Sequence, residues 1–136
     1  MGDAASNKEL VLKFWGSRPK EQAAFLTDDA VWHLPTSIAN RSFRGVTDLR
    51  GDAARAIFDA ATEVYEPGGS MDVLHVVAED DLVTLHCQLH TRTKAGNEYH
   101  GTYHMLFRLE DDRIAETWEF LDTAYLADCM GPPTGF

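Results

Sequence analysis

The sequence predicts an α+β fold, with one curved antiparallel sheet and helices packed against one of its faces. Two observations support this prediction. Apolar residues recur at helical spacing up to about residue 64, and four β-rich runs at hairpin spacing follow them. The length of 136 residues is typical of one domain, so we expect residues 1–136 to form a single domain.

The first part of the chain is predicted to be mainly helical. Ser6-x-x-Glu9 is an expected capping box ahead of apolar residues at helical spacing. Pro19 suits a first helical turn, and "KEQAAFL" after it predicts a second short helix. "AVWHLP" predicts a short strand, and residues 36–45 a loop. Thr47 is the expected cap of a longer helix that ends before "EPGG".

The second part is predicted to hold four strands and a last helical turn, "TAYLADCM". The strands cover about residues 71–79, 82–93, 98–110 and 113–122. The short turns "KAGN" and "EDDR" join the last three strands and fix their expected register. They place Thr93 opposite Glu98 and Leu109 opposite Ile114.

The composition excludes several classes of function. A formal net charge of −10 argues against nucleic acid and against anionic membrane surfaces as partners, because both attract basic patches. No apolar run approaches the roughly 20 residues of a membrane span, and we expect no secretory signal. Cys87 and Cys129 are too few for a disulfide framework, so we expect a reduced, cytoplasmic protein.

The predicted register assigns each strand residue to one face of the sheet, because side chains alternate along a strand. One face combines most of the aromatic residues with a few polar groups, as ligand cavities do: His86, Gln88, His90, Tyr103, Met105, Phe107, Ile114, Glu116, Trp118, Phe120 and Asp122. The other face is aliphatic at one end and polar at the other, as in a subunit interface: Val83, Leu85, Cys87, Leu89, His100, Thr102, His104, Leu106, Arg108, Thr117 and Glu119.

Four of the six histidines form two H-x-x-x-H pairs: His86 with His90, and His100 with His104. The predicted register places only the first pair in the cavity, so a four-histidine metal site is not expected. The spacing carries no recognised metal signature, and we expect no metal. A two-histidine site with Asp122 or Glu116 as third ligand is the alternative. In the cavity, Gly101 has no side chain and would leave space for a bound molecule between His90 and Asp122.

Three strings resemble the nuclear-transport-factor-2-like superfamily, particularly its SnoaL-like and ketosteroid-isomerase-like branches: "LTDDAVWHLP", "SFRG" and "YHMLFRLEDDRIAETWEFLD". The resemblance covers nearly the whole chain. It implies a cone-shaped sheet, with a mixed or short edge strand, and three N-terminal and central helices that close a deep pocket. It also implies a homodimer, in agreement with the aliphatic face of the second long strand.

The resemblance transfers only some functional residues. The aspartate of W-x-x-x-D, an acid–base residue in SnoaL-like cyclases, corresponds to Asp122. The base of ketosteroid isomerases corresponds to Leu34, their buried aspartic acid to Met105, and their helix-one tyrosine has no match. Steroid isomerisation by that mechanism is therefore not expected. The Arg/Asp pair of limonene-epoxide hydrolases falls at His86 and Gln88, which disfavours that mechanism as well.

These features predict a cofactor-free acid–base enzyme, a lyase or isomerase that acts on a small hydrophobic, aromatic or polycyclic molecule. The reaction would be a dehydration, cyclisation, double-bond shift or C–C cleavage. Asp122 and His90 would share the proton transfers, while Tyr103 and His86 would polarise an oxygen. The expected substrate-binding residues are mostly aromatic: Trp32, Phe14, Trp15, Gln88, Met105, Phe107, Trp118 and Phe120.

Each assignment has an alternative. Asp122 is also placed to cap the terminal helical turn, and Tyr103 and His86 can be core residues with satisfied hydrogen bonds. Strand parity points His33 away from the pocket, and His75 is not placed. The whole protein can instead be a non-catalytic ligand-binding or dimerisation module.

Overall fold

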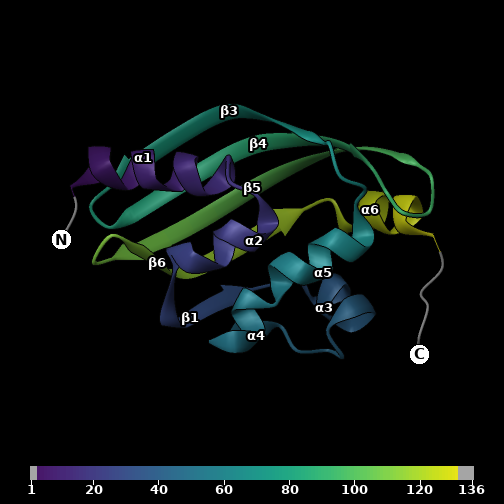
Figure 1. Cartoon of the computed structure of the whole chain (residues 1–136), viewed down its shortest axis with the longest axis horizontal. Helices are drawn as coiled ribbons and strands as arrows, with labels where there is room; N and C mark the ends of the chain where they lie inside the picture. The colour runs from purple at the N-terminus through teal and green to yellow at the C-terminus, as the bar shows by residue number, and fades with distance from the viewer. Residues whose placement is uncertain (1–2, 132–136) are drawn as a thin grey trace.

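A computed structural model, which describes residues 3–131, confirms the α+β fold (Figure 1). Six strands form one curved sheet in the order β2-β1-β6-β5-β4-β3. β1 runs parallel to β6, and the other neighbouring strands are antiparallel, so the sheet is mixed at its β1 side. The helices lie on one face and at one end of the sheet, and none of the helices within residues 3–131 covers the upper side of β3, β4 and β5 in Figure 1.

The first two predicted helices are present. α1 (Ala4–Trp15) begins at Asp3, whose carboxylate accepts a hydrogen bond of 2.8 Å from the Ser6 backbone N–H. The expected capping box is therefore wrong, because the cap lies one turn earlier and Ser6 is inside the helix. The second short helix consists of α2 (Pro19–Gln22) and a 3₁₀ turn, η1 (Ala23–Phe25).

The region between residues 26 and 64 differs most from the prediction. β1 (Leu26–His33) is longer than expected, and α3 (Thr36–Ser42) replaces a predicted loop. The long helix predicted from Thr47 is divided into several elements: β2 (Asp48–Arg50), α4 (Asp52–Arg55) and α5 (Ile57–Val64). Gly51, with a φ of 57°, turns the chain from β2 into α4, a conformation that glycine adopts without strain.

The second part follows the predicted boundaries within one residue at most ends: β3 (Ser70–Glu79), β4 (Leu82–Arg92), β5 (Glu98–Glu110), β6 (Arg113–Leu121) and α6 (Thr123–Met130). Among residues 3–131, no helix is long and apolar enough to cross a membrane. Both cysteines are buried and free.

The turn between β4 and β5 is one residue shorter than predicted. The Thr93 N–H donates to the Asn97 carbonyl at 2.9 Å, and Gly96 has a φ of 92°. This geometry is a three-residue turn that ends in a left-handed residue, and such turns are common in hairpins. It places Arg92, not Thr93, opposite Glu98. The whole of β4 is therefore shifted by one residue against β5, which exchanges its two faces.

The turn between β5 and β6 is as predicted, with Leu109 opposite Ile114, but a β-bulge follows it. Arg108 lies opposite Glu116, so Ala115 is the extra residue. A bulge reverses the alternation of all later residues in its strand. Beyond Ala115, β6 therefore presents to each face the residues that were predicted for the other.

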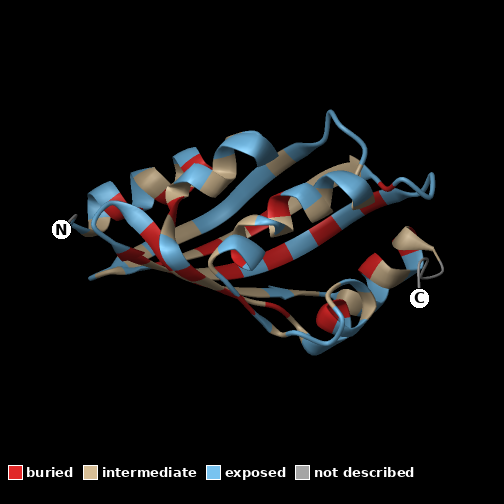
Figure 2. Ribbon diagram, turned by 60° about the horizontal axis from the view of Figure 1, so that its bottom comes forward, coloured by how far each residue is buried: buried red, intermediate tan, exposed pale blue. Residues whose placement is uncertain are grey.

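The two shifts define an inner face, which packs against the helices, and an outer face, which does not. Figure 2 shows the resulting alternation of buried and exposed residues along the strands. The inner face carries aliphatic and aromatic side chains with one carboxylate: Val83, Leu85, Cys87, Leu89, Tyr99, Tyr103, Met105, Phe107, Thr117 and Glu119. Phe14 of α1 packs over this face with no exposed surface.

Candidate active site

A cavity of about 1220 Å³, including its open mouth, lies between the inner face and the helices. Its walls come from α1, α2, α3, α5, α6 and the inner face of the sheet, and are mainly apolar: Trp15, Trp32, Leu34, Ile38, Phe43, Ile57, Phe58, Ala61, Val64, Met71, Leu89, Met105, Leu126 and Met130. An apolar cavity with a few converging polar groups is the usual form of a small-molecule site.

Glu119 places a carboxyl group in this apolar cavity. It extends from β6 opposite Met105 of β5, and its Oε1 accepts a hydrogen bond of 2.9 Å from the Trp32 indole N–H. Burial raises the pKa of Glu119 from 4.5 to about 7, although the hydrogen bond from Trp32 acts in the opposite direction. A carboxyl group with such a pKa exchanges protons near neutral pH, as a general base or acid must.

A tyrosine cluster, formed by Tyr65, Tyr99 and Tyr103, lies beside this carboxyl group. The Tyr103 hydroxyl is 2.9 Å from the Tyr65 hydroxyl and 3.0 Å from the Tyr99 hydroxyl. Burial raises the pKa of Tyr103 far above its ordinary value, and burial raises the pKa of Tyr99 to about 12. All three side chains therefore keep their protons at neutral pH.

The tyrosine cluster has one more proton than its internal hydrogen bonds use. Three hydroxyls carry three hydrogens, and the two short O···O distances use two of them. Tyr65 and Tyr103 both line the cavity. The remaining hydrogen can therefore be donated to an oxygen atom of a bound molecule.

Tyr103 and Glu119 are diagonal neighbours on adjacent strands, because Tyr103 lies opposite Leu121. Such residues are about 7–8 Å apart, and their Cβ atoms are somewhat closer. Their side chains can hold a molecule between them, with a hydrogen-bond donor at one end and a proton acceptor at the other. The charge of Glu119 also contributes to the raised pKa of Tyr103, after burial and the neighbouring tyrosines.

Four predicted site residues line the cavity: Tyr103, Trp15, Trp32 and Met105. Phe14 and Phe107 lie in the core behind the wall, where neither has any exposed surface. Gln88 is on the outer face opposite Thr102, and Trp118 stacks on His33 with ring centroids 5.0 Å apart. Phe120 is also on the outer face, 58% exposed. The predicted placement of these three residues in the pocket is wrong, because it depended on the unshifted register.

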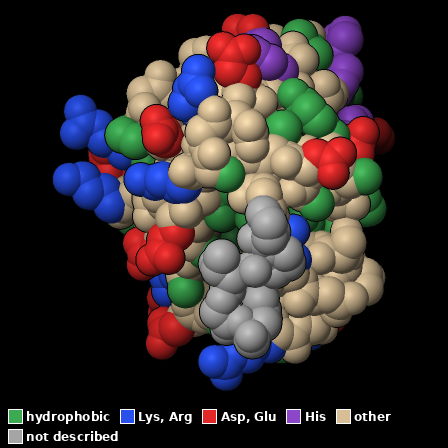
Figure 3. Space-filling model, turned by 90° about the vertical axis from the view of Figure 1, so that its right-hand side faces the viewer, with side chains coloured by type: hydrophobic (Ala, Val, Ile, Leu, Met, Phe, Trp, Pro, Cys, Tyr) green, Lys and Arg blue, Asp and Glu red, His purple; other side chains and the backbone are tan. Residues whose placement is uncertain are grey.

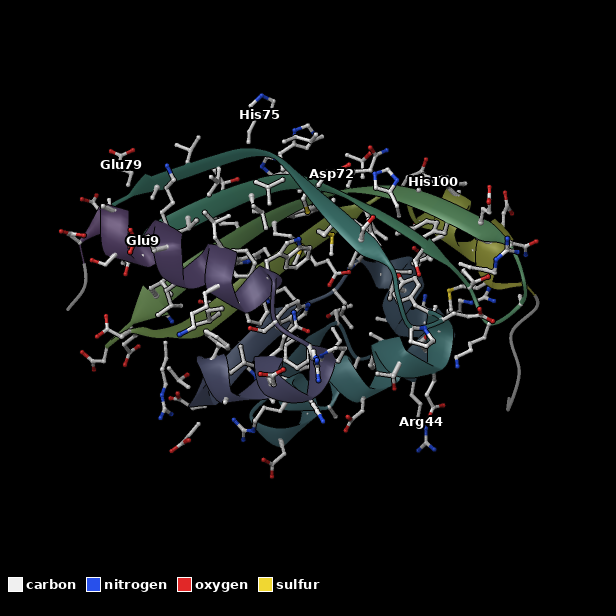
Figure 4. The ribbon with its side chains drawn as sticks, turned by 45° about the horizontal axis from the view of Figure 1, so that its top comes forward. Glu9, Arg44, Asp72, His75, Glu79 and His100 are labelled. Atoms are coloured by element: carbon white, nitrogen blue, oxygen red, sulfur yellow. The ribbon has the colours of Figure 1, made fainter. Side chains whose placement is uncertain are left out.

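His86 and His90 also lie on the outer face, so their predicted placement in the cavity is wrong. His86 pairs with His104 across β4 and β5, and His90 pairs with His100, so all four histidines share one face. The His90 ring is 2.9 Å from the Asp72 carboxylate. Figure 4 shows His75, Asp72 and His100 pointing away from the helices, and Figure 3 shows histidine side chains gathered on the same side.

Asp122 adopts the alternative role that the sequence allowed. Its carboxylate accepts a hydrogen bond of 3.1 Å from the Tyr125 backbone N–H and caps α6. Asp122 is not among the residues that line the cavity. His90 and Asp122 therefore do not face each other across Gly101 as expected. The space above Gly101 is not open either, because the Tyr99 ring occupies it.

His33 points away from the cavity, as strand parity predicted. Its ring nitrogens lie 2.8 Å from the Asp48 carboxylate and 2.6 Å from the Glu116 carboxylate. Burial acts to lower the pKa of His33, but the hydrogen bonds to Glu116 and Asp48 raise it above its ordinary value. Within residues 3–131, no group of three or more His, Cys, Asp or Glu side chains is arranged to hold a metal ion.

Three residues of the site were missed in the sequence. Glu119 was assigned to the other face, and Tyr65 and Tyr99 were not considered. Glu119 had one usable signal, since it is a carboxylate within the apolar pattern of "WEFL". Tyr99, Gly101 and Tyr103 follow one another at intervals of two residues, so they lie on the same face of a strand. This spacing is a second signal, for the tyrosine cluster. Tyr65 had none, because it reaches the cluster only through the fold.

The comparisons with known proteins agree with this architecture. The sequence profile of the SnoaL-like domain matches residues 12–117. No curated protein matches the sequence significantly. Among solved structures, Bal32a from a soil-derived mobile gene cassette superposes with a TM-score of 0.78 at 20% identity, over 96% of this chain and 100% of that chain.

Two further structures are similar at comparable identity. A proposed SnoaL-like polyketide cyclase from Jannaschia sp. CCS1 superposes with a TM-score of 0.77 at 18% identity, over 98% of this chain and 97% of its own. Wild-type IdmH, a proposed polyketide cyclase from Streptomyces antibioticus, has a TM-score of 0.73 at 17% identity, over 93% and 99% of the two chains. At such identities, the likeness shows the fold alone. Because the profile match spans most of the chain and the sheet and helices have the same arrangement, the chain belongs to the SnoaL-like family of the nuclear-transport-factor-2-like fold.

Proposed function

We propose that this protein is a cofactor-free acid–base enzyme, a lyase or isomerase, that acts on a small hydrophobic ketone in the cavity. The observation that carries the proposal is the pairing of a half-buried carboxyl group, Glu119, with the tyrosine cluster in an otherwise apolar pocket. The polyketide cyclases proposed among its structural neighbours are consistent with a polycyclic substrate.

The geometry supports proton abstraction beside a carbonyl group. Ionised Glu119 removes a proton from the carbon next to the carbonyl, and the C–H electron pair moves into a C=C bond. The carbonyl oxygen becomes an enolate oxygen, which accepts the surplus hydrogen bond of the tyrosine cluster through Tyr103. Preorganised hydrogen-bond donors stabilise such an oxyanion. Return of the proton to another carbon, attack on a second carbonyl or loss of a leaving group would complete an isomerisation, a cyclisation or a lyase reaction.

Deuterium exchange tests this proposal without knowledge of the natural product. The protein is incubated in D₂O with a panel of aromatic and polycyclic ketones, and NMR follows the hydrogens next to the carbonyl. We expect at least one ketone to exchange faster with the protein than without it. Binding of ketones by native mass spectrometry with no exchange of any of them would contradict the proposal and favour the non-catalytic ligand-binding module.

Replacement of the cluster's central hydroxyl is expected to slow this exchange. Tyr103→Phe keeps the ring but removes the donor, and loss of one oxyanion donor lowers turnover by about 10²-fold. The measurement is the exchange rate at saturating ketone. Thr102→Val, at the next position of β5 but exposed on the outer face opposite Gln88, is the control and is expected to keep the wild-type rate. An unchanged rate in Tyr103→Phe would show that the tyrosine cluster does not hold the reacting oxygen.

We also propose that the protein is a homodimer that uses its outer face. The aliphatic face first expected to form the interface is the inner face and is occupied by the core. The outer face exposes Val77, which is 61% exposed, and Phe120 among histidines and threonines. The outer face is formed by four strands, β3 to β6, of about ten residues each. At a strand spacing of about 4.8 Å its area is roughly 600 Å², close to the ~800 Å² per partner of a standard interface. The cytoplasmic location stays a prediction from the sequence.

A charge introduced on the outer face is expected to break the dimer. In Phe120→Asp, each copy would bury an unpaired carboxylate against the other, which costs several kcal/mol. Light scattering after size exclusion is expected to give twice the chain mass for the wild type and one chain mass for the variant. Val46→Asp changes an apolar residue that is also exposed, at 49%, in the loop between α3 and β2, and it should leave the mass unchanged. A monomeric wild type would contradict the proposal.

A further inference from the structure

The hydroxyls of Tyr99 and Tyr103 are in contact although the two residues are four positions apart along β5. Four residues of a strand span about 13 Å, so two upright side chains at this separation would not touch. Their hydroxyls are nevertheless 3.0 Å apart. The Tyr99 ring must therefore lean along β5 toward Tyr103, and it crosses the position of Gly101, which lies between them on the same face.

The space above Gly101 is filled by Tyr99. A Cβ atom on Gly101 would overlap the hydroxyl oxygen and Cζ of Tyr99 and would lie 2.7 Å from its Cε2. The backbone does not require glycine here, because Gly101 is not among the residues with positive φ. What the position requires is the absence of a side chain.

The Tyr99 ring cannot avoid such a Cβ atom by a small movement. It is fully buried, with the Tyr65 ring stacked at 5.9 Å on centroids and the Tyr125 ring at 5.2 Å. Tyr125 is itself held, since its hydroxyl accepts a hydrogen bond of 3.1 Å from the His100 backbone N–H. Interiors of this density resist even one added methyl group.

We infer that Gly101 is a positioning residue for the proposed active site. Its bare backbone lets the Tyr99 ring lie along β5, so that the Tyr99 hydroxyl holds the Tyr103 hydroxyl toward the cavity. Gly101 touches no substrate and acts through Tyr99 and Tyr103. The effect on the tyrosine cluster is independent of the proposed function, and the effect on ligand oxygen binding rests on it.

The first test observes the tyrosine hydroxyl directly. The protein is labelled with ¹³C at tyrosine Cζ, and the Tyr103 signal is identified by its loss in Tyr103→Phe. We expect Gly101→Ala and Tyr99→Phe to shift the Tyr103 signal in the same direction. Thr102→Ala, the next residue on the opposite face, should not move it. A wild-type Tyr103 signal in Gly101→Ala would overturn the inference.

The second test measures the effect on an oxyanion in the cavity. The probe is para-nitrophenol, whose ionised oxygen imitates an enolate and whose absorbance reports binding. Loss of the hydrogen bond to Tyr103 is expected to weaken binding about tenfold in Gly101→Ala and in Tyr99→Phe. The double variant Gly101→Ala/Tyr99→Phe should be no weaker than either single variant, since both remove one hydrogen bond. Fully additive losses would overturn the inference.

The two tests separate the possible failures. A shifted Tyr103 signal with no binding of para-nitrophenol by any form supports the positioning role and contradicts the proposed function. Wild-type affinity in Gly101→Ala, with tight binding to the wild type, contradicts the positioning role alone. If Gly101→Ala does not fold, Gly101→Ala/Tyr99→Leu removes the overlap and is expected to fold. Failure of that double variant would show that the backbone requires glycine and would overturn the inference.

Discussion

Replacement of Glu119 by glutamine is expected to lower turnover on the order of 10²–10⁴-fold, the usual contribution of a positioned general base. Glutamine has nearly the same shape, and its carbonyl oxygen can still accept the hydrogen bond from the Trp32 indole. The fold and the cavity are therefore expected to persist, and only the proton acceptor is lost. The measurement is the rate at which the hydrogens next to the ketone carbonyl exchange in D₂O or, once a substrate is found, kcat and KM.

The pH profile of the wild type should report the same group. Only the ionised form of Glu119 can remove a proton, and its pKa is about 7. The rate is therefore expected to rise with pH through about 7 and then to level off. Glu110→Gln, which changes an exposed carboxylate at the end of β5, is the matched control and should keep the wild-type profile. A wild-type rate in Glu119→Gln would show that Glu119 is not the base.

The same substitution is expected to stabilise the fold above neutral pH. Folding raises the pKa of Glu119 from 4.5 to about 7, so the folded state keeps this proton in a range where the unfolded chain has lost it. Stability from this group is thus fully present below about 4.5 and is lost as the pH rises toward 7. The loss is about 3 kcal/mol at most, because the cavity admits some solvent. Urea unfolding of Glu119→Gln at two pH values should show the gain only at the higher one.

Truncation of Phe14 to alanine is expected to cost about 3–5 kcal/mol of unfolding free energy. The Phe14 ring is fully buried and lies 5.7–6.4 Å, on centroids, from five other aromatic rings: Trp15, Phe25, Trp32, Phe58 and Phe107. It joins α1 to the inner face and supports the cavity wall. A loss of this size is a large part of the total stability of a typical domain.

Urea or thermal unfolding measures this effect. Val46→Ala removes apolar atoms from an exposed position outside the outer face, in the loop between α3 and β2, and should change stability by less than about 0.5 kcal/mol. Phe14→Leu keeps most of the volume and should cost less than Phe14→Ala, which keeps the comparison measurable if the alanine variant does not fold. A cost below about 1 kcal/mol for Phe14→Ala would show that the aromatic core can close the gap.

The fold could be predicted from the sequence because its signals are local and repeated. The β5 strand and α6 have the predicted bounds, since alternating β-rich residues and a capping aspartate mark them. The predicted helix from Thr47 was wrong because an apolar stripe does not reveal that residues 48–50 pair with β1. Strand pairing depends on distant residues, and it overrides local helical preference.

The candidate site could be predicted only in part, because it depends on register. Tyr103, Trp15, Trp32 and Met105 line the cavity, and their role in catalysis or binding stays a prediction. Glu119 was missed because of a single bulge residue, and the histidines were misplaced because one turn is a residue shorter than expected. Turn length and bulges are set by small differences in backbone conformation, which leave little trace in composition.

The bulge at Ala115 makes the effect of a deletion in β6 depend on its position. Ile114 and Glu116 pair with consecutive residues of β5, Leu109 and Arg108, so loss of the Ala115 codon would remove the bulge and leave Thr117 and Glu119 on the inner face. Loss of the Trp118 codon would instead bring Phe120 opposite Met105 and turn Glu119 to the outer face. The cavity would then exchange its carboxyl group for an aromatic ring in a single genetic event, so a gap after the bulge in a relative would mark a change of chemistry, and a gap at the bulge would not.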